Sequence, residues 1–223
     1  MNRHPISGIY AITPELEDTA QLLARVSAVL AGGIRLIQYR NKTGSAQLQR
    51  RQCETLFECV RAVDAALIIN DNAQLAADVG AHGVHLGKDD ATIADARRLL
   101  GPDKIIGISC YNSLDRAREQ ERAGADYVAF GSFFPSVTKP HAVAASLDLL
   151  SAARTQLKVP VVAIGGIDRN NAMRLFDNGA DAVAVLSALF SADEIEQEAR
   201  AFTRLQAQRN LQSRYESENR YVQ

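Results

Sequence analysis

The chain has 223 residues, of which 47% are hydrophobic and 23% charged, so a sizeable core with a solvated surface is expected. Its formal net charge of -1 does not favour nucleic acid or an anionic membrane as a partner, and any attraction for an anion must be local. The 3 cysteines show no CxxC spacing, and neither a signal peptide nor an apolar run of about 20 residues is present, which together indicate a cytosolic protein with free thiols.

Short apolar runs alternate with amphipathic stretches along the whole chain. The runs lack strict polar alternation, which is typical of strands covered on both faces. Between them, apolar residues recur at helical spacing, as in Leu22–Leu30 and Cys53–Val60. This alternation implies parallel strands joined by right-handed crossovers. The predicted strands are Gly8–Thr13, Ile34–Tyr39, Leu67–Asn70, Gly83–Leu86, Ile105–Ser109, Tyr127–Phe130, Val161–Ile164 and Ala182–Leu186.

A weak internal repeat supports repeated βα units. The pairs Gly80-Ala81, Gly124-Ala125 and Gly179-Ala180 each end a helical pattern and lead straight into a strand. We therefore predict an α/β fold consisting of one (β/α)8 TIM barrel over residues 1–223. An open doubly wound sheet is the alternative, but no GxGxxG fingerprint follows the first strand. The polar C-terminal extension, residues 206–223, is expected to lengthen the last helix and then fray.

Basic side chains follow the second predicted strand, at the end of a parallel barrel where active sites lie. Arg40 and Lys42 are two residues apart and would project to the same side of an extended segment. Together with Lys139 they would gather positive charge around an anion such as a diphosphate. A pair of solvated surface cations is the alternative interpretation.

Asp71 and Asp90 suggest a Mg2+ site at the same end of the barrel. Mg2+ commonly takes one or two carboxylates and completes its shell with water and phosphate oxygens. Asp71 directly follows an apolar strand, and Asp90 lies shortly after Gly87. Alternatively, Asp89 or Asp90 caps the helix that begins near Thr92, and the residues alone do not decide which.

Two further segments are candidates for binding phosphate. Gly165-Gly166 leads into a predicted helix start at Ile167, where backbone N–H groups can approach a phosphate, and Ser187 could donate a hydroxyl to the same group. The longest connection, from Gly131 to about Ala145, carries hydroxyls and a lysine that could close over a substrate. A function-free insertion is the alternative for that loop.

Other chemistries find little support. His85 lies within a strand and is expected to be packed or hydrogen-bonded rather than a metal ligand, and Cys110 is interpreted as packing. No HxxxH spacing, Ser/His/Asp order or CxxC pair occurs. A metalloprotease, a hydrolase or a redox enzyme is therefore disfavoured.

Several separated motifs occur along the chain, beginning in the first strand. They are Ile9-Tyr10-Ala11-Ile12-Thr13, Gln38-Tyr39-Arg40-Asn41-Lys42, Asn70-Asp71, Val84-His85-Leu86-Gly87-Lys88-Asp89-Asp90, Ser136-Val137-Thr138-Lys139 and Gly165-Gly166-Ile167. In this order, from about Gly8 to Phe190, they resemble the thiamine-phosphate synthase family.

This resemblance implies a reaction in which a pyrimidine diphosphate joins a thiazole phosphate, releasing diphosphate and forming thiamine phosphate. It implies Mg2+ as cofactor on Asp71 and Asp90, and small phosphorylated molecules as partners. By the same likeness, Arg40, Lys42, Ser109 and Lys139 act in catalysis. The implied residues for the pyrimidine diphosphate are Gln38, Tyr39, Arg40, Asn41, Lys42, Asn70, Ser109 and Lys139, and those for the thiazole phosphate are Ser136, Val137, Thr138, Gly166, Leu186 and Ser187.

The departures from the family pattern are modest. Lys88 stands where the family often has glutamine and adds a charge near the metal site, while Ser136 replaces threonine and keeps the hydroxyl. The alternatives are a thiazole tautomerase, an isomerase or decarboxylase that acts on another sugar phosphate, and a protein that binds phosphorylated ligands without turnover. The sequence leaves a homo-oligomer open.

Overall fold

The computed structural model describes residues 5–135 and 144–219, and side chains as far as residue 208. Within these residues, parallel strands follow one another around a closed barrel in chain order. The strands are β1 (Gly8–Ile12), β2 (Leu36–Tyr39), β3 (Ala66–Asn70), β4 (Gly83–Leu86), β5 (Ile105–Tyr111), β6 (Tyr127–Gly131), β7 (Val161–Ile164) and β8 (Ala182–Val185). The helices are α1 (Thr19–Ala31), α2 (Ala46–Arg61), α3 (Ala73–Asp78), α4 (Ile93–Leu100), α5 (Leu114–Arg122), α6 (Leu147–Gln156), α7 (Ala172–Asp177), α8 (Ser187–Phe190) and α9 (Ile195–Asn219).

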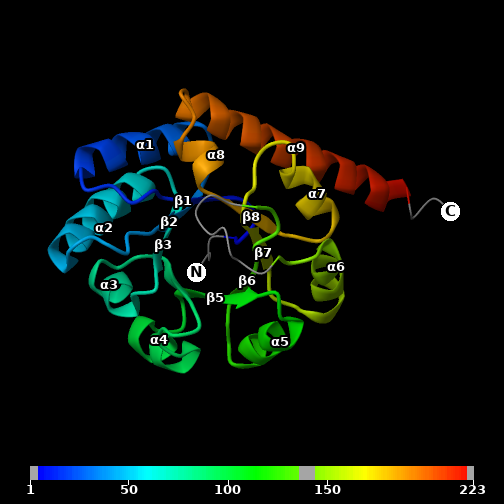
Figure 1. Cartoon of the computed structure of the whole chain (residues 1–223), viewed down its shortest axis with the longest axis horizontal. Coiled ribbons are helices and arrows are strands. Elements are labelled where there is room, and N and C mark those ends of the chain that lie inside the picture. The colour runs from blue at the N-terminus through cyan, green and yellow to red at the C-terminus, as the bar shows by residue number, and fades with distance from the viewer. Residues whose placement is uncertain (1–4, 136–143, 220–223) are drawn as a thin grey trace.

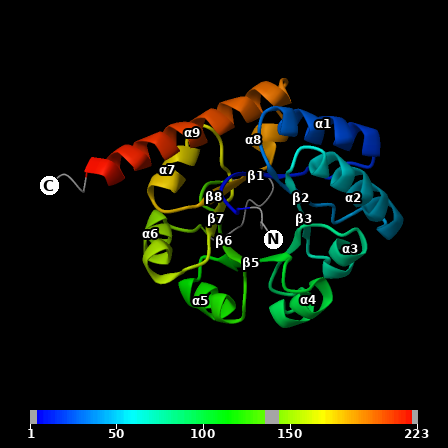
Figure 2. The same cartoon turned by 180° about the vertical axis from the view of Figure 1, so that it is seen from behind.

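The closed sheet confirms the predicted (β/α)8 TIM barrel. β8 returns to pair with β1, so the alternative of an open sheet is wrong. The helices form a ring around the strands (Figure 1), and α9 lies along one side of that ring in the view from behind (Figure 2). The strand bounds agree with the prediction to within one residue, except at two places. β2 begins only at Leu36, and β5 continues to Tyr111 through a register shift that follows Ser109.

Alternation along each strand separates two apolar layers. Residues such as Tyr10, Ile68 and Val162 point into the barrel and form its interior cluster. The intervening residues, such as Ile37 and Val84, pack outward against the helices in a larger cluster. Because side chains of a strand alternate between its two faces, this pattern decides which polar residues can reach the centre of the barrel.

The three predicted Gly-Ala joints are present at the amino ends of the strands. Their glycines, Gly80, Gly124 and Gly179, all have positive φ values, which L side chains rarely adopt. The residue after each Ala also has one shared role. It accepts a backbone N–H from the first or second residue of the preceding strand: His82 Nδ1 from Leu67 N at 3.0 Å, Asp126 Oδ2 from Ile106 N at 2.8 Å, and Asp181 Oδ2 from Val161 N at 2.8 Å.

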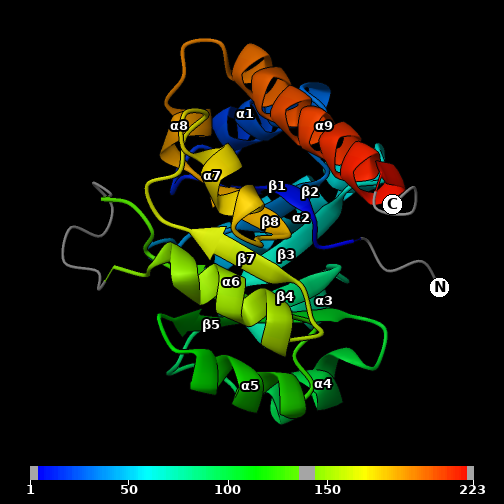
Figure 3. The ribbon, with the colours of Figure 1, turned by 90° about the vertical axis from the view of Figure 1, so that its right-hand side faces the viewer.

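The last helix, α9, packs against α1 and covers one side of the barrel through the buried Ala199 and Phe202. It continues to Asn219, so the polar extension does lengthen the final helix, as predicted. In the side view, β7 points toward the end of the molecule where α8 lies, while the last turns of α9 lie toward the other end (Figure 3). In the part of the chain that is described, no helix is long and apolar enough to span a membrane.

Candidate active site

A cavity of about 850 Å³ opens at the carboxyl ends of the strands. Residues from both predicted binding groups line it, and they come from strands on opposite sides of the barrel. The predicted residues that it brings together are Gln38, Arg40, Lys42, Asn70, Asp71, Asp90, Ser109, Gly166, Leu186 and Ser187. Lys88 also lines this cavity. Ser136, Val137, Thr138 and Lys139 lie outside the described residues.

Tyr39 and Asn41 belong to the predicted pyrimidine group but do not line the cavity. Strand alternation turns Tyr39 outward, where its hydroxyl donates to Gln52 Oε1 at 2.8 Å. The Asn41 side chain accepts from Gly44 N at 2.8 Å and donates to Gln52 Oε1 at 3.2 Å. These hydrogen bonds fix the turn that carries Arg40 and Lys42. Tyr39 and Asn41 therefore affect the cavity through the conformation of this turn rather than by lining it.

Arg40 and Lys42 both line the cavity, as expected, and each is paired with a carboxylate. Arg40 contacts Glu15 at 2.5 Å, and its backbone N–H donates to the buried Thr13 hydroxyl at 2.9 Å. Lys42 Nζ lies 2.9 Å from Asp71 Oδ2. Glu15 was not identified from the sequence, because it lies in the connection after β1 with no motif around it.

Asp71 and Asp90 face one another beside Lys42. Asp71 has φ 64, a strained conformation for a residue other than glycine, which places its carboxylate at the tip of β3. Burial raises the pKa of Asp90, the hydrogen bond from Gly87 N lowers it, and the neighbouring Asp71 carboxylate raises it again. Neither Asp89 nor Asp90 caps α4, since Thr92 does so by accepting from Asp95 N.

The carboxylate pair fits Mg2+ better than a softer metal. The two oxygen donors have like charges in a partly buried place, an arrangement that a cation would relieve. Within the described ranges, no group of three or more His, Cys, Asp or Glu side chains could hold a metal ion. A cation here would therefore take its remaining oxygens from water and from a bound phosphate.

A chain of hydrogen bonds crosses the interior of the barrel beneath the cavity. Gln38 Nε2 donates to Tyr10 OH at 2.9 Å, and the Tyr10 and Tyr127 hydroxyls lie 3.0 Å apart. His85 Nδ1 lies 2.8 Å from Tyr127 OH, and its Nε2 lies 2.9 Å from Ser109 Oγ. His85 is thus hydrogen-bonded, as predicted. The two tyrosines were not recognised as part of the site, although their inward strand positions could have indicated it.

Gly165 and Gly166 form a tight turn after β7. Both have positive φ values, and a Cβ on Gly166 would collide with the carbonyl oxygens of Phe134 and Pro135. Asn171 braces the turn, because its Nδ2 donates to Gly166 O at 3.0 Å and its Oδ1 accepts from Asp168 N at 2.9 Å.

The helix expected from Ile167 begins only at Ala172. That prediction was wrong because the Asp168 side chain accepts the backbone N–H groups of Asn170 and Asn171 and forms a turn first. The glycine turn, rather than a helix N-terminus, therefore lines the cavity at this point.

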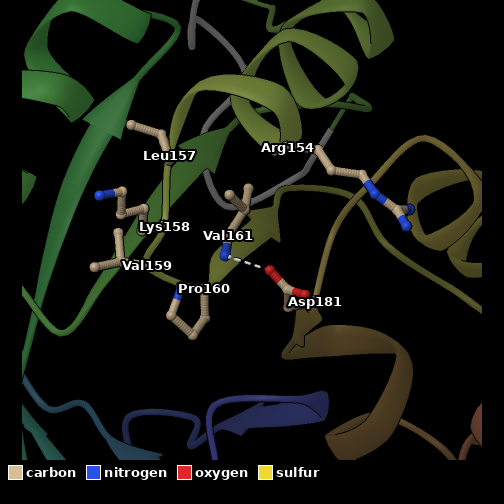
Figure 4. Close-up of a pocket in the computed structure, with 7 residues that line it drawn as sticks. All are labelled: Arg154, Leu157, Lys158, Val159, Pro160, Val161 and Asp181. Atoms are coloured by element: carbon tan, nitrogen blue, oxygen red, sulfur yellow. Dashed lines mark hydrogen bonds between the residues drawn. The ribbon is translucent and has the colours of Figure 1, made fainter.

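A second, smaller pocket of about 210 Å³ lies at the opposite end of the barrel, near the start of β7. Figure 4 shows Asp181 bonded to Val161 N there, while Arg154 and Lys158 extend in different directions. Because its cations do not converge, this pocket offers no comparable anion site.

Comparisons with known proteins agree with this geometry. The family model described as thiamine monophosphate synthase matches residues 9–189. A thiamine-phosphate synthase of Nitrosospira multiformis is 54% identical over 203 residues, covering 91% of this chain and 87% of that protein. Another, of Thiobacillus denitrificans, is 52% identical over 198 residues, covering 89% and 94%. The solved thiamine phosphate pyrophosphorylase from Pyrococcus furiosus superposes with a TM-score of 0.79 at 34% identity, covering 89% of this chain and 94% of that one.

Proposed function

The chain belongs to the thiamine monophosphate synthase family of transferases, and we propose that it joins 4-amino-2-methyl-5-(diphosphooxymethyl)pyrimidine to 4-methyl-5-(2-phosphooxyethyl)thiazole. The products are thiamine phosphate and diphosphate. One observation carries this assignment. A single cavity gathers the basic side chains Arg40, Lys42 and Lys88 and a carboxylate pair on one side and the glycine turn with Ser187 on the other, which suits two phosphorylated substrates held side by side.

The leaving diphosphate is bound by the side of the cavity that carries Arg40 and Lys42. Arg40 offers planar paired donors and Lys42 a mobile point charge, and both stabilise the negative charge that develops as the C–O bond breaks. Ser109 contributes a hydroxyl to the same substrate. Lys139, outside the described residues, is proposed to add a third cation.

Mg2+ held by Asp71 and Asp90 would supply further neutralisation of the diphosphate oxygens. The two carboxylates would hold the cation near Lys42, which contacts Asp71, so positive charge would be available to the leaving group. Lys88 lines the same region and adds a charge next to the pair.

The thiazole phosphate is bound by Gly166 N–H and Ser187, which holds the thiazole nitrogen near the reacting carbon. Ser136, Val137 and Thr138 are proposed to complete this group, and Leu186 supplies an apolar wall. After diphosphate leaves, the electron-rich aminopyrimidine stabilises the cation at its exocyclic methylene, and the thiazole nitrogen forms the new C–N bond. No proton is transferred and no protein nucleophile is needed, so positioning and charge account for the rate.

The direct test is a coupling assay with purified protein and both substrates, with Mg2+ or with a chelator in excess. Thiamine phosphate and diphosphate are measured in parallel, and equal amounts should form only with Mg2+. Lys158→Met, at the opposite end of the barrel, serves as a control variant and should retain full turnover.

The rival functions predict other results in the same assay. A binding protein would bind both ligands by calorimetry without forming product. A tautomerase would convert thiazole isomers without consuming the pyrimidine diphosphate. Either outcome, or equal turnover with the chelator present, would overturn the proposal.

A further inference from the structure

We propose that the buried hydroxyls of Tyr10 and Tyr127 are positioning groups that fix which way the hydrogen bonds run at Gln38 and Ser109, at the two ends of the interior chain. This inference rests on the proposed function for its catalytic meaning, because Gln38 and Ser109 both line the cavity assigned to the substrates. Its structural content, the direction of the hydrogen bonds, can be tested without turnover.

The direction of each hydrogen bond follows from counting the hydrogens that the side chains from Gln38 to Ser109 can donate. The Gln38 amide nitrogen can only donate, so Tyr10 oxygen accepts from it. The single Tyr10 hydrogen is then available for Tyr127 oxygen, and the single Tyr127 hydrogen for His85 Nδ1. A neutral imidazole with an unprotonated Nδ1 carries its hydrogen on Nε2 and donates it to Ser109 Oγ.

The two ends of the chain consequently present opposite groups to the cavity. Ser109 accepts from His85, so its own hydrogen is free to be donated to an anionic oxygen of the substrate. Gln38 uses its nitrogen toward Tyr10, so Oε1 remains as an acceptor for a substrate donor. A leaving diphosphate needs donors and an amino-substituted ring offers N–H groups, so this polarity matches the proposed substrate.

The surroundings hold the chain in place. Tyr10 is 1% exposed and Tyr127 0%, and burial raises the pKa of both, so both hydroxyls keep their hydrogens. The His85 ring stacks on Tyr127 with centroids 5.5 Å apart. A Cβ at Gly107 would collide with the Tyr127 ring, so the glycine leaves the space in which that ring lies.

The first experiment measures the His85 tautomer by nitrogen NMR on protein labelled at its 4 histidines. His85→Gln identifies the signal. We expect hydrogen on Nε2 in the wild type, a mixture of tautomers in Tyr127→Phe, and the wild-type tautomer in Tyr10→Phe, where Tyr127 can still donate. Hydrogen on Nδ1 in the wild type would mean the reverse polarity, with the Gln38 oxygen toward Tyr10, and would overturn the inference. An unchanged signal in Tyr127→Phe would do the same.

The second experiment is kinetic. Both Tyr→Phe variants keep the ring and lose one hydroxyl with its two hydrogen bonds, so kcat/KM for the pyrimidine diphosphate should fall by about 10-fold while KM for the thiazole phosphate stays constant. Thr203→Val is the matched control, since it removes a hydroxyl that bonds Gly32 O outside the barrel. Equal losses for both substrates would indicate a merely structural role and contradict the inference.

The two experiments separate this inference from the proposed function. If the wild type shows the expected tautomer but forms no thiamine phosphate, the polarity stands and the proposed function fails. If coupling is active but His85 carries its hydrogen on Nδ1, the proposed function stands and the inference fails.

Discussion

Lys42 and Asp71 form an ion pair 2.9 Å long, although each is assigned a different partner in the working site. Lys42 is assigned to the diphosphate, and Asp71 to the metal. A cation that binds Asp71 must therefore displace Lys42, unless an anion has already drawn the ammonium away. In the proposed function, this pair would make binding of the metal and binding of the diphosphate mutually favourable.

We predict that Mg2+ binds more tightly in the presence of inorganic diphosphate than alone, as measured by calorimetry. Lys42→Met should strengthen Mg2+ binding without diphosphate and lower kcat/KM by about 100-fold, the loss typical of removing one charge-stabilising donor. An unchanged Mg2+ affinity in this variant would show that the ion pair does not compete with the metal.

Asp90 predicts a pH dependence of stability in the metal-free protein. Its pKa is raised chiefly by burial and further by Asp71, so the folded state binds more protons than the unfolded state above the ordinary carboxyl pKa. The free energy of unfolding should therefore fall as the pH rises from the ordinary carboxyl pKa through the raised pKa of Asp90. Asp90→Asn should remove the fall and stabilise the metal-free protein above it by less than about 1 kcal/mol, because solvent screens a partly exposed site.

Thermal unfolding between pH 4 and 8 in chelator measures this effect. Asp95→Asn should change the pH dependence of stability in the opposite direction, because the pKa of Asp95 is lowered, mainly by the hydrogen bond from the Thr92 hydroxyl. That carboxylate stabilises the fold above its unfolded pKa, and its contribution is lost as pH falls. A destabilised Asp90→Asn variant at neutral pH would contradict the predicted sign.

At the scale of elements, the Gly-Ala joints lie at the amino ends of the strands, so mutations there should affect stability without affecting catalysis at the carboxyl ends. Asp181 accepts the backbone N–H of the buried Val161 at the start of β7, far along the strand from the cavity. Asp181→Ala should lower the free energy of unfolding by about 1–3 kcal/mol, toward the lower end because the adjoining pocket can admit water. Urea unfolding measures the loss.

The exposed Asp177, on the neighbouring α7, offers the matched control. Asp177→Ala should change stability by no more than about 0.5 kcal/mol. Both variants should keep the wild-type kcat, and a stable but inactive Asp181→Ala would contradict the assignment of this end of the barrel to stability.

Strand positions and joints could be predicted because they depend on local patterns. Apolar runs marked the strands, and glycine before a strand marked Gly80, Gly124 and Gly179 correctly. Alternation also distinguishes Gln38, which points inward, from Tyr39, which points outward, whereas the family motif treats both alike. The later start of α7 depends on a side chain, Asp168, that bonds the backbone and competes with the helix.

Contacts across the barrel could not be predicted in the same way. Tyr10 and Tyr127 come from strands far apart in sequence, and their meeting depends on closure of the sheet and on the space left by Gly107. The partner of Arg40, Glu15, likewise depends on how one loop folds over another. The sequence indicated that Arg40, Lys42, Asp71 and Asp90 lie at the cavity, but it also included Tyr39 and Asn41, which do not line it, and did not indicate the hydrogen bonds that orient these residues.

Across the whole molecule, the cavity and the amino-end joints occupy opposite ends of the strands. The effects on the free energy of unfolding of a mutation at one end and of ligand binding at the other should therefore be additive. We predict that Mg2+ with diphosphate raises the melting temperature of Asp181→Ala by the same amount as that of the wild type, since ligand stabilisation depends only on affinity and concentration. A much smaller rise, measured by scanning calorimetry, would reveal coupling between the two ends.

Gly107 and Tyr127 share one volume, because any side chain at residue 107 would enter the space of the tyrosine ring. The order of mutations in any descendant of this sequence is thereby constrained. A larger residue at position 107 fits only after Tyr127 has been replaced by a smaller residue. That first substitution removes the ring and the hydroxyl that contact His85. Evolution away from this pair must pass through an impaired intermediate, so the two positions are expected to persist together or to change together.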